Sequence, residues 1–429
     1  MKNTQSPRTR LIGTFARLIL SVVVVACFAA SAFSLPVEAI TPINNREYAP
    51  AVRTLFQNAK KRILLHLYQA RYYPEYPDTA TNYFLTDLIA AKKRGVDVKV
   101  LMDMGDWNPS NKNEYNADFC DRLTTSGIEI WYDSPTDVSH EKVIVVDETI
   151  TVVSSHNWTF YSLAKNNEVG VVIFSPEVNA WFTRYWADHA KLGQPKANTI
   201  PASLELANYK APANAGAATG SLTGADLKDF RKYPAADVEP IADRLFYPAM
   251  HREFLNAKQS IDVVQRSLSL YDNLPRIAGK SPLPGEPASM TNVLAEDLVS
   301  AHKRGVKVQV ILSTPEGFDT SDSDKTAAYL MPKGVAVYHD DPKVQTHAKM
   351  AMVDSDKTIV GSTNWTYPAI EQGNEASVIV TSPEVNKVYQ DYVATILKSG
   401  APYKVQAGKS IWDSTSNASS RGSAKAPAD

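Results

Sequence analysis

Two stretches of the chain carry the same reactive side chains at the same spacing. The shared pattern is His-x-Lys-x₄-Asp, and its two occurrences are His140, Lys142, Asp147 and His347, Lys349, Asp354. An imidazole can attack phosphorus or transfer a proton, and an ammonium group binds phosphate oxygens. With eight His residues in the chain, one chance occurrence is expected roughly 0.02 times. The two occurrences therefore indicate a duplicated site rather than coincidence.

The duplication extends beyond this pattern. At a constant offset of 207 residues, the first copy matches the second without insertion or deletion across about forty residues. The matching segments include Ser155-x-Asn157-Trp158-Thr159 with Ser362-x-Asn364-Trp365-Thr366, and Asn167-Glu168 with Asn374-Glu375. Self-similarity at a fixed offset indicates two copies of one structural unit.

The repeat divides the chain into segments. We expect a targeting segment at 1–39, repeats at 41–193 and 240–403, a linker at 194–239 and a disordered tail at 404–429. The linker is rich in Ala, Pro, Gly and Ser, and the tail is rich in Ser, Ala and Lys. Such compositions are typical of connections that build no core of their own.

The targeting segment has the three parts of a secretory signal. Lys2, Arg8 and Arg10 precede an apolar run from 11 to 35, and small residues near Ala39 offer a cleavage site. This pattern predicts a secreted or periplasmic protein. An uncleaved membrane anchor is the alternative, because the run is long enough to span a bilayer.

Composition and charge narrow the functional classes. The chain is 44% hydrophobic and 21% charged, with a formal net charge of -1, and loss of residues 1–39 would leave a larger acidic excess. The chain therefore lacks the overall excess of basic residues that is typical of non-specific nucleic-acid binders. A local basic cleft is still compatible with this net charge. Cys120 would then be the sole cysteine, which excludes an intramolecular disulfide, and we expect it to be buried in a helix.

The remaining imidazoles suggest no metal site by their spacing. No Cys/His cluster has the spacing of a zinc site. We expect packed or surface positions for His66, His189, His251, His302 and His339. The two tryptophans that follow Asn157 and Asn364 are expected to pack in the core.

Apolar periodicity predicts alternating helices and strands within each copy. In the first copy, helices are predicted over 47–61, 82–94, 116–125 and 176–191. Strands are predicted over 63–68, 96–102, 128–132, 142–146, 150–153 and 168–174. Continuous apolar strands between helices predict an α/β/α sandwich, and the tight turn between the strands at 142–153 makes its sheet mixed.

Side-chain alternation along the strands separates the members of the pattern. His140 and Lys142 share one parity, whereas Asp147 has the other. We therefore expect structural roles, such as pairing with a turn or a lysine, for Asp147 and its counterpart Asp354. Short polar side chains after the turn are expected to bind phosphate oxygens; these are Ser155, Asn157, Ser362 and Asn364. A carboxylate at Glu168 or Glu375 could hydrogen-bond a histidine and fix its tautomer.

Paired around a pseudo-twofold axis, the two sets make one site for a phosphodiester. Two lysines and polar donors can hold the non-bridging oxygens without a metal. One imidazole can attack phosphorus and the other can protonate the leaving alcohol. The second imidazole can then activate water against the phosphohistidine.

On these motifs, the chain from about 45 to 400 resembles the phospholipase D superfamily, the two-copy "HKD" enzymes. The resemblance implies two similar α/β halves with one cleft between them, a phosphohistidine intermediate, and no required metal or cofactor. It implies His140 as nucleophile and His347 as acid and base, a choice that pseudo-symmetry leaves open. It also implies phosphate contacts from Lys142, Lys349, Asn157 and Asn364, and histidine-orienting roles for Glu168 and Glu375. Ser154 stands where the family has Gly, which predicts poorer backbone approach to phosphate in the first copy.

The function expected first is a phosphodiesterase, a monomer that hydrolyses or transfers phosphatidyl groups, with phospholipid and a membrane surface as partners. A secreted nuclease of the same superfamily is the second hypothesis, with DNA or RNA as substrate. Transfer of the cardiolipin-synthase type is the third. The non-enzymatic alternative is an inert envelope binding module.

Overall fold

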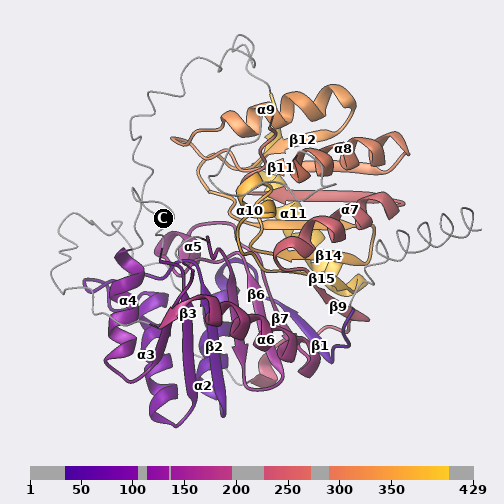
Figure 1. Cartoon of the computed structure of the whole chain (residues 1–429). Helices are drawn as coiled ribbons and strands as arrows, with labels where there is room; N and C mark the ends of the chain where they lie inside the picture. The colour runs from indigo at the N-terminus through magenta and orange to yellow at the C-terminus, as the bar shows by residue number, and fades with distance from the viewer. Residues whose placement is uncertain (1–33, 105–113, 135–136, 196–226, 272–288, 405–429) are drawn as a thin grey trace, which may run out of the picture. The chain divides into compact units, whose positions relative to one another are not determined.

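The computed structural model describes residues 34–104, 114–134, 137–195, 227–271 and 289–404 (Figure 1). Most of the targeting segment, most of the linker and nearly all of the tail expected from the sequence lie outside these residues. Within the described residues, no helix combines the length and the apolar character needed to cross a bilayer.

The first half contains one mixed sheet of eight strands in the order β1-β7-β6-β5-β2-β3-β4-β8 (Figure 1). Its strands are β1 (Ala39–Pro42), β2 (Arg62–Leu67), β3 (Asp97–Met102), β4 (Glu129–Tyr132), β5 (Lys142–Val146), β6 (Ile150–Ser154), β7 (Gly170–Phe174) and β8 (Gln194–Pro195). Strands β2, β3 and β4 run parallel to one another. Strand β2 pairs antiparallel with β5, and the pairs β5–β6, β6–β7 and β7–β1 are antiparallel as well. The mixed sheet predicted from the sequence is confirmed.

Helices cover both faces of this sheet because its central strands are apolar on both sides. They are η1 (Asn45–Glu47), α2 (Tyr48–Asn58), α3 (Ala80–Lys93), α4 (Glu114–Thr124), α5 (Phe160–Ala164) and α6 (Pro176–Leu192). Ile63 and Leu65 of β2 belong to the core formed with α2, α3 and α4, whereas Leu64 belongs to the core that contains α6. Cys120 is fully buried in α4, as expected.

The second half repeats this arrangement strand for strand, in the order β9-β15-β14-β13-β10-β11-β12-β16. Its strands are β9 (Asp237–Pro240), β10 (Ser260–Gln265), β11 (Lys307–Leu312), β12 (Ala336–His339), β13 (Lys349–Val353), β14 (Lys357–Gly361), β15 (Ser377–Thr381) and β16 (Ala401–Pro402). Its helices are η3 (Asp243–Leu245), α7 (Phe246–Asn256), α8 (Met290–Lys303), α9 (Ser321–Leu330), η4 (Met331–Lys333), α10 (Tyr367–Glu371) and α11 (Pro383–Ser399). The α/β fold with two similar halves is thereby confirmed. Strand β8, η2 (Leu227–Asp229) and all of β9 except Pro240 lie within the segment expected as a linker.

One apolar cluster joins the two halves. It contains Val143 and Phe182 from the first half and Met350 and Tyr389 from the second. The Tyr389 hydroxyl also donates a hydrogen bond to the carbonyl of Gly170, at 2.8 Å. Burial of a shared core of this kind stabilises the pair of halves as one unit.

The chain around β1 also belongs to this folded unit. Leu35 forms a β-bridge with Val238, and the Glu38 N–H donates to the carbonyl of Phe174 at 2.8 Å. Ala39 is the first residue of β1. A cut after Ala39 would remove these pairings, whereas a cut before Leu35 would keep them.

Candidate active site

The two histidines of the repeated pattern lie just before β5 and β13, where the halves meet. The His140 N–H donates to the carbonyl of Asn374 at 2.9 Å, and the His347 N–H donates to the carbonyl of Asn167 at 2.8 Å. Each of these segments also forms a β-bridge with the opposite half. Each histidine is therefore positioned by the backbone of the other copy.

The side chains cross between the halves in the same way. Nδ1 of His140 lies 2.9 Å from Oε1 of Glu375, and Nδ1 of His347 lies 3.0 Å from Oε2 of Glu168. Both glutamates are buried. A carboxylate bound at Nδ1 fixes the tautomer and leaves Nε2 for chemistry at phosphorus. The orienting role considered for these two glutamates therefore matches the geometry, with each serving the histidine of the opposite copy.

The two serines expected to bind phosphate instead hold these carboxylates. The Ser155 hydroxyl donates to Oε2 of Glu168, and the Ser362 hydroxyl donates to Oε2 of Glu375, both at 2.5 Å. Both serines are fully buried. Their hydroxyl protons are thus committed to glutamate, and we revise the expected role of both serines from phosphate binding to carboxylate positioning.

The two His–Glu pairs differ in their electrostatics. Glu168 accepts a further hydrogen bond from the hydroxyl of Ser162 at 2.6 Å, and the repeat has Ala369 at that position. Burial alone would raise the pKa of Glu168, but the charge and hydrogen bond of His347 bring it down to about 2. The pKa of Glu375 is instead raised well above its ordinary value by burial, which the charge of Lys142 only partly offsets.

The same difference appears in the imidazoles. Burial lowers the pKa of His347 to about 4, although the charge of Glu168 opposes the shift. Burial, with the charges of Lys142 and Lys349, brings the pKa of His140 well below its ordinary value. Burial therefore favours the neutral form of both imidazoles, and His347, beside the ionised Glu168, is the one better placed to take up and hold a proton.

Both lysines are withdrawn from solvent beside the histidines. Lys142 is 1% exposed and Lys349 is 3% exposed. The ammonium of each donates to the carbonyl of the histidine two residues before it, and that of Lys142 also lies 4.7 Å from the centre of the Tyr68 ring. Burial lowers the pKa of Lys142 to about 8 and that of Lys349 well below its ordinary value. A bound phosphate would offset this loss of hydration with opposite charge.

Both imidazoles line one cavity of about 210 Å³. Asn157 lines it as expected, whereas its counterpart Asn364 is half-buried and not part of the lining. The lining also includes Tyr68, Arg266 and Phe318, which were not expected from the sequence. Tyr68 and Arg266 directly follow the equivalent strands β2 and β10, so they occupy matching positions in the two copies with different residue types. The cavity thus combines the two histidines with an added guanidinium and two aromatic rings.

Comparison with known proteins agrees with this geometry. A family model described as "Cardiolipin synthase, PLD-like domain" matches residues 52–189 and 253–397, which include both copies of the pattern. The chain belongs to the phospholipase D superfamily. A phosphatidylserine synthase from Haemophilus influenzae Rd KW20 has the same fold, with a TM-score of 0.60 over 86% of this chain and 88% of that one, at 16% identity.

Sequence relatives match shorter segments of this phospholipase D superfamily member. A mitochondrial cardiolipin hydrolase from Danio rerio is 28% identical over 176 residues, which cover 38% of this chain and 75% of the relative. A phospholipase D from Rickettsia bellii is 29% identical over 99 residues, or 23% of this chain and 46% of the relative. A mitochondrial cardiolipin hydrolase from Xenopus laevis is 35% identical over 103 residues and is matched over 45% of its length. The names of these relatives support phosphodiesterase chemistry in this chain.

The aspartates of the superfamily pattern lie at the far ends of β5 and β13. Asp147 has a positive φ of 51°, and its carboxylate accepts the backbone N–H groups of Lys60, Lys61 and Arg62 at 2.7–3.2 Å. Asp354 does the same for residues 258–260 at 2.6–3.1 Å. Both aspartates hold a turn, as their strand parity predicted.

Ser154 has a packing explanation within the sheet. It pairs with Gly170 in the first half, whereas Gly361 pairs with Ser377 in the second. A Cβ on Gly361 would lie 2.1 Å from the Ser377 hydroxyl oxygen, which leaves no room for it. Each copy therefore keeps one serine and one glycine at this contact, on opposite strands. We therefore explain Ser154 by its packing against Gly170, and no longer by an effect on the approach of phosphate to the backbone.

Proposed function

We propose that this chain is a phospholipase D-like phosphodiesterase that hydrolyses or transfers phosphatidyl groups through a phosphohistidine. The observation that carries the proposal is the crossed pairing, in which one cavity holds two imidazoles, each bound by a buried glutamate of the opposite half. A half alone could not orient its own histidine. The two desolvated ammonium groups beside them supply positive charge for a phosphate.

The electrostatic difference between the pairs supports distinct roles. Nε2 of His140 attacks phosphorus, forming a P–N bond while the P–O bond to the leaving alcohol breaks. His347 starts this step as the imidazolium, favoured by the ionised carboxylate of Glu168 at Nδ1 and by the charge of the bound phosphate, and it gives its Nε2 proton to that oxygen. His347 then takes a proton from water as the water oxygen attacks phosphorus and the electron pair of the P–N bond returns to His140. Lys142 and Lys349 neutralise the charge that develops on the phosphoryl oxygens.

A lipid substrate is supported by the names of the relatives, which refer to cardiolipin and phosphatidylserine chemistry. Nuclease activity is the second candidate, and the observation in its favour is Arg266 in the cavity lining. A guanidinium there can contact a second phosphate of a nucleic-acid backbone. The same contact would also suit a lipid with two phosphates, so the substrates must be compared directly.

The test is an assay of the purified full chain on phosphatidylcholine vesicles, cardiolipin vesicles and plasmid DNA, each with and without EDTA. We expect release of headgroup or phosphatidic acid from the vesicles and no nicking of the plasmid. Nicking without lipid turnover would replace the lipid proposal with the nuclease. If neither these substrates nor a bis-aryl phosphodiester is turned over, the inert binding module is the hypothesis that remains.

We also propose export of the protein to the periplasm or the medium, on the strength of the N-terminal sequence. Cell fractionation tests it. Recovery of the chain in the cytoplasm would reject the proposal, and recovery with the membrane fraction would favour the uncleaved anchor.

A further inference from the structure

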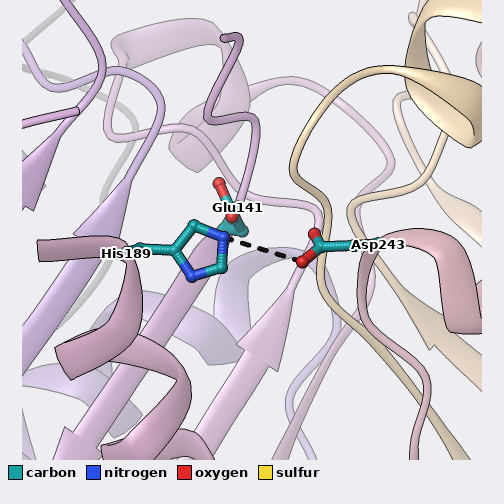
Figure 2. A group of neighbouring side chains, drawn as sticks. All are labelled: Glu141, His189 and Asp243. Carbon is teal, nitrogen blue, oxygen red and sulfur yellow. Dashed lines mark ion pairs between the residues drawn. The ribbon is translucent and has the colours of Figure 1, made fainter. Parts of the chain in front are cut away.

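A second cluster of titratable side chains lies where the halves meet, outside the catalytic pairs (Figure 2). It comprises Glu141, His189 and Asp243, whose ligand atoms all lie within 4.8 Å of one another. Glu141 stands between the two reactive residues of the first pattern, His189 lies on α6, and Asp243 begins η3 of the second half. The three side chains thus come from three separate segments of the chain and from both halves.

The two carboxylates of this cluster share a single hydroxyl as hydrogen-bond donor. The Tyr185 hydroxyl oxygen lies 2.7 Å from Oε1 of Glu141 and 2.8 Å from Oδ1 of Asp243. One hydroxyl has one proton and can donate it to one of these oxygens. Two carboxylates that converge with a single shared proton repel each other unless a further positive charge joins them.

Buried polar atoms without a hydrogen-bond partner occur in and beside this cluster. Oε2 of Glu141 and both ring nitrogens of His66 have no hydrogen-bond partner within the described residues, and these side chains are 0% and 1% exposed. Nε2 of His66 lies 3.4 Å from that Oε2, and Nε2 of His189 lies 3.6 Å from Oδ2 of Asp243. Bonds of about 2.0–2.2 Å to a tetrahedral ion place neighbouring ligand atoms about 3.4 Å apart.

The duplication supplies an internal comparison. The positions equivalent to the four residues carry no matching ligands, and they are Val264 for His66, Ala348 for Glu141, Ile396 for His189 and Asn45 for Asp243. Tyr185 is retained as Tyr392, whose hydroxyl donates to Oδ1 of Asn45 at 2.9 Å. The fold therefore forms at the symmetry-related place without two carboxylates and two imidazoles, so the presence of these groups at the first place needs a separate reason.

We propose that Glu141, His189 and Asp243 bind a structural divalent metal ion, with Nε2 of His66 as the candidate for a fourth position. Imidazole and carboxylate ligands in this number suit Zn²⁺. The ion would tie the halves together beside the catalytic pairs, because Asp243 also accepts the N–H of Glu375 at 2.9 Å. The metal takes no part in the phosphoryl chemistry, and the proposal does not depend on the proposed function.

The test is zinc binding by the full chain after removal of metal with EDTA, followed by isothermal titration with Zn²⁺ and measurement of metal content by mass spectrometry. We expect one equivalent per chain and a higher unfolding temperature for the loaded protein, because the unfolded chain holds no such site. Asp243→Asn should lower the affinity by at least about tenfold. This variant keeps the positive-φ turn, because Asn45 has the same φ of 51° as Asp243.

The matched control is His251→Gln, which alters a His–carboxylate pair of 2.7 Å with Asp297 that has no third ligand among the described residues. It should bind zinc like the unaltered chain. Equal uptake by Asp243→Asn and the unaltered chain, or no stoichiometric uptake at all, would overturn the proposal. If Asp243→Asn does not fold, Co²⁺ replaces Zn²⁺ in the unaltered chain. The visible bands of tetrahedral cobalt are then expected, and their absence would equally overturn the proposal.

Discussion

His140 of the first half makes its side-chain hydrogen bond to Glu375 of the second half, with 2.9 Å between Nδ1 and Oε1. The reciprocal pair, His347 and Glu168, has 3.0 Å between Nδ1 and Oε2. Neither half therefore contains a complete His–Glu pair. Each half expressed alone would hold a histidine without its carboxylate.

Removing the charge of an orienting glutamate should reduce turnover. Glu168→Gln keeps the size of the side chain but removes the anion that stabilises the imidazolium of His347. We expect kcat to fall by about two to four orders of magnitude. The control is Glu148→Gln, which alters an exposed ion pair with Lys61 at the surface. A variant of Glu168 with unchanged kcat would reject the role of this pair.

Alanine variants of the two histidines should lose different steps of the reaction. On a phosphodiester with a nitrophenol leaving group, which needs no acid, His347→Ala should give a single burst of product and then stop. His140→Ala should give no burst, because no P–N bond can form. Rapid-mixing absorbance measures both. A burst from His140→Ala, with none from His347→Ala, would exchange the two roles.

Acid should destabilise the fold through the pair of His347 and Glu168. His347 has a pKa of about 4, below that of an unfolded histidine, so the unfolded state binds more protons and stability falls as pH drops from about 6.5 to 4. Glu168, with a pKa of about 2, adds a loss of stability from about pH 4.5 downwards. Urea denaturation at several pH values measures the slope. His347→Gln should flatten it between pH 6.5 and 4, and an unchanged slope would contradict the assignment.

Arg266 should affect substrate binding more than the chemical step. Its guanidinium lines the cavity and lies 5.8 Å from the centre of the Phe318 ring. Arg266→Gln should raise KM by about tenfold for a substrate with two phosphates and leave kcat nearly unchanged. A substrate with one phosphate serves as the comparison and should show a smaller change in KM. Loss of kcat with a constant KM would instead place Arg266 in the chemistry.

Processing of the N-terminus should occur before Leu35. The Leu35 pairing with Val238 and the hydrogen bond from the Ser175 hydroxyl to the carbonyl of Pro36 would both be lost by a cut after Ala39. N-terminal sequencing of the exported protein should therefore find its first residue at or before Leu35. A chain that begins at Ile40 and unfolds at the same temperature as one beginning at Leu35 would contradict this interpretation.

The central elements could be predicted because their signals are local. A continuous apolar run predicts β5 at its observed bounds, and α6 begins at Pro176 as predicted, where the Ser175 hydroxyl caps Val178 N–H. The edge strands β1 and β9 were missed. They are four residues long, and their strand character comes from pairing with β7 and β15 rather than from their own pattern.

The members of the site could be predicted, but not their partners. Spacing identifies His140 and Glu375, yet nothing in the sequence says which copy's glutamate meets which histidine. The hydrogen bond from the Ser155 hydroxyl to Glu168 forms only in the folded chain and leaves no trace in the sequence. The sequence therefore predicted a phosphate contact for Ser155 instead. Arg266 was missed because the repeat has Tyr68 at the equivalent position, so similarity between the copies gave no signal for a cation there.

The β-bridges of Asn167 and Asn374 with the opposite half restrict how the molecule can move. A hinge motion that parted the halves would break both bridges and pull both imidazoles from their carboxylates at once. We therefore expect the two halves to stay together while a substrate enters, rather than to open about a hinge. In that case the scissile phosphate reaches the imidazoles through the cavity that Tyr68, Arg266 and Phe318 help to line.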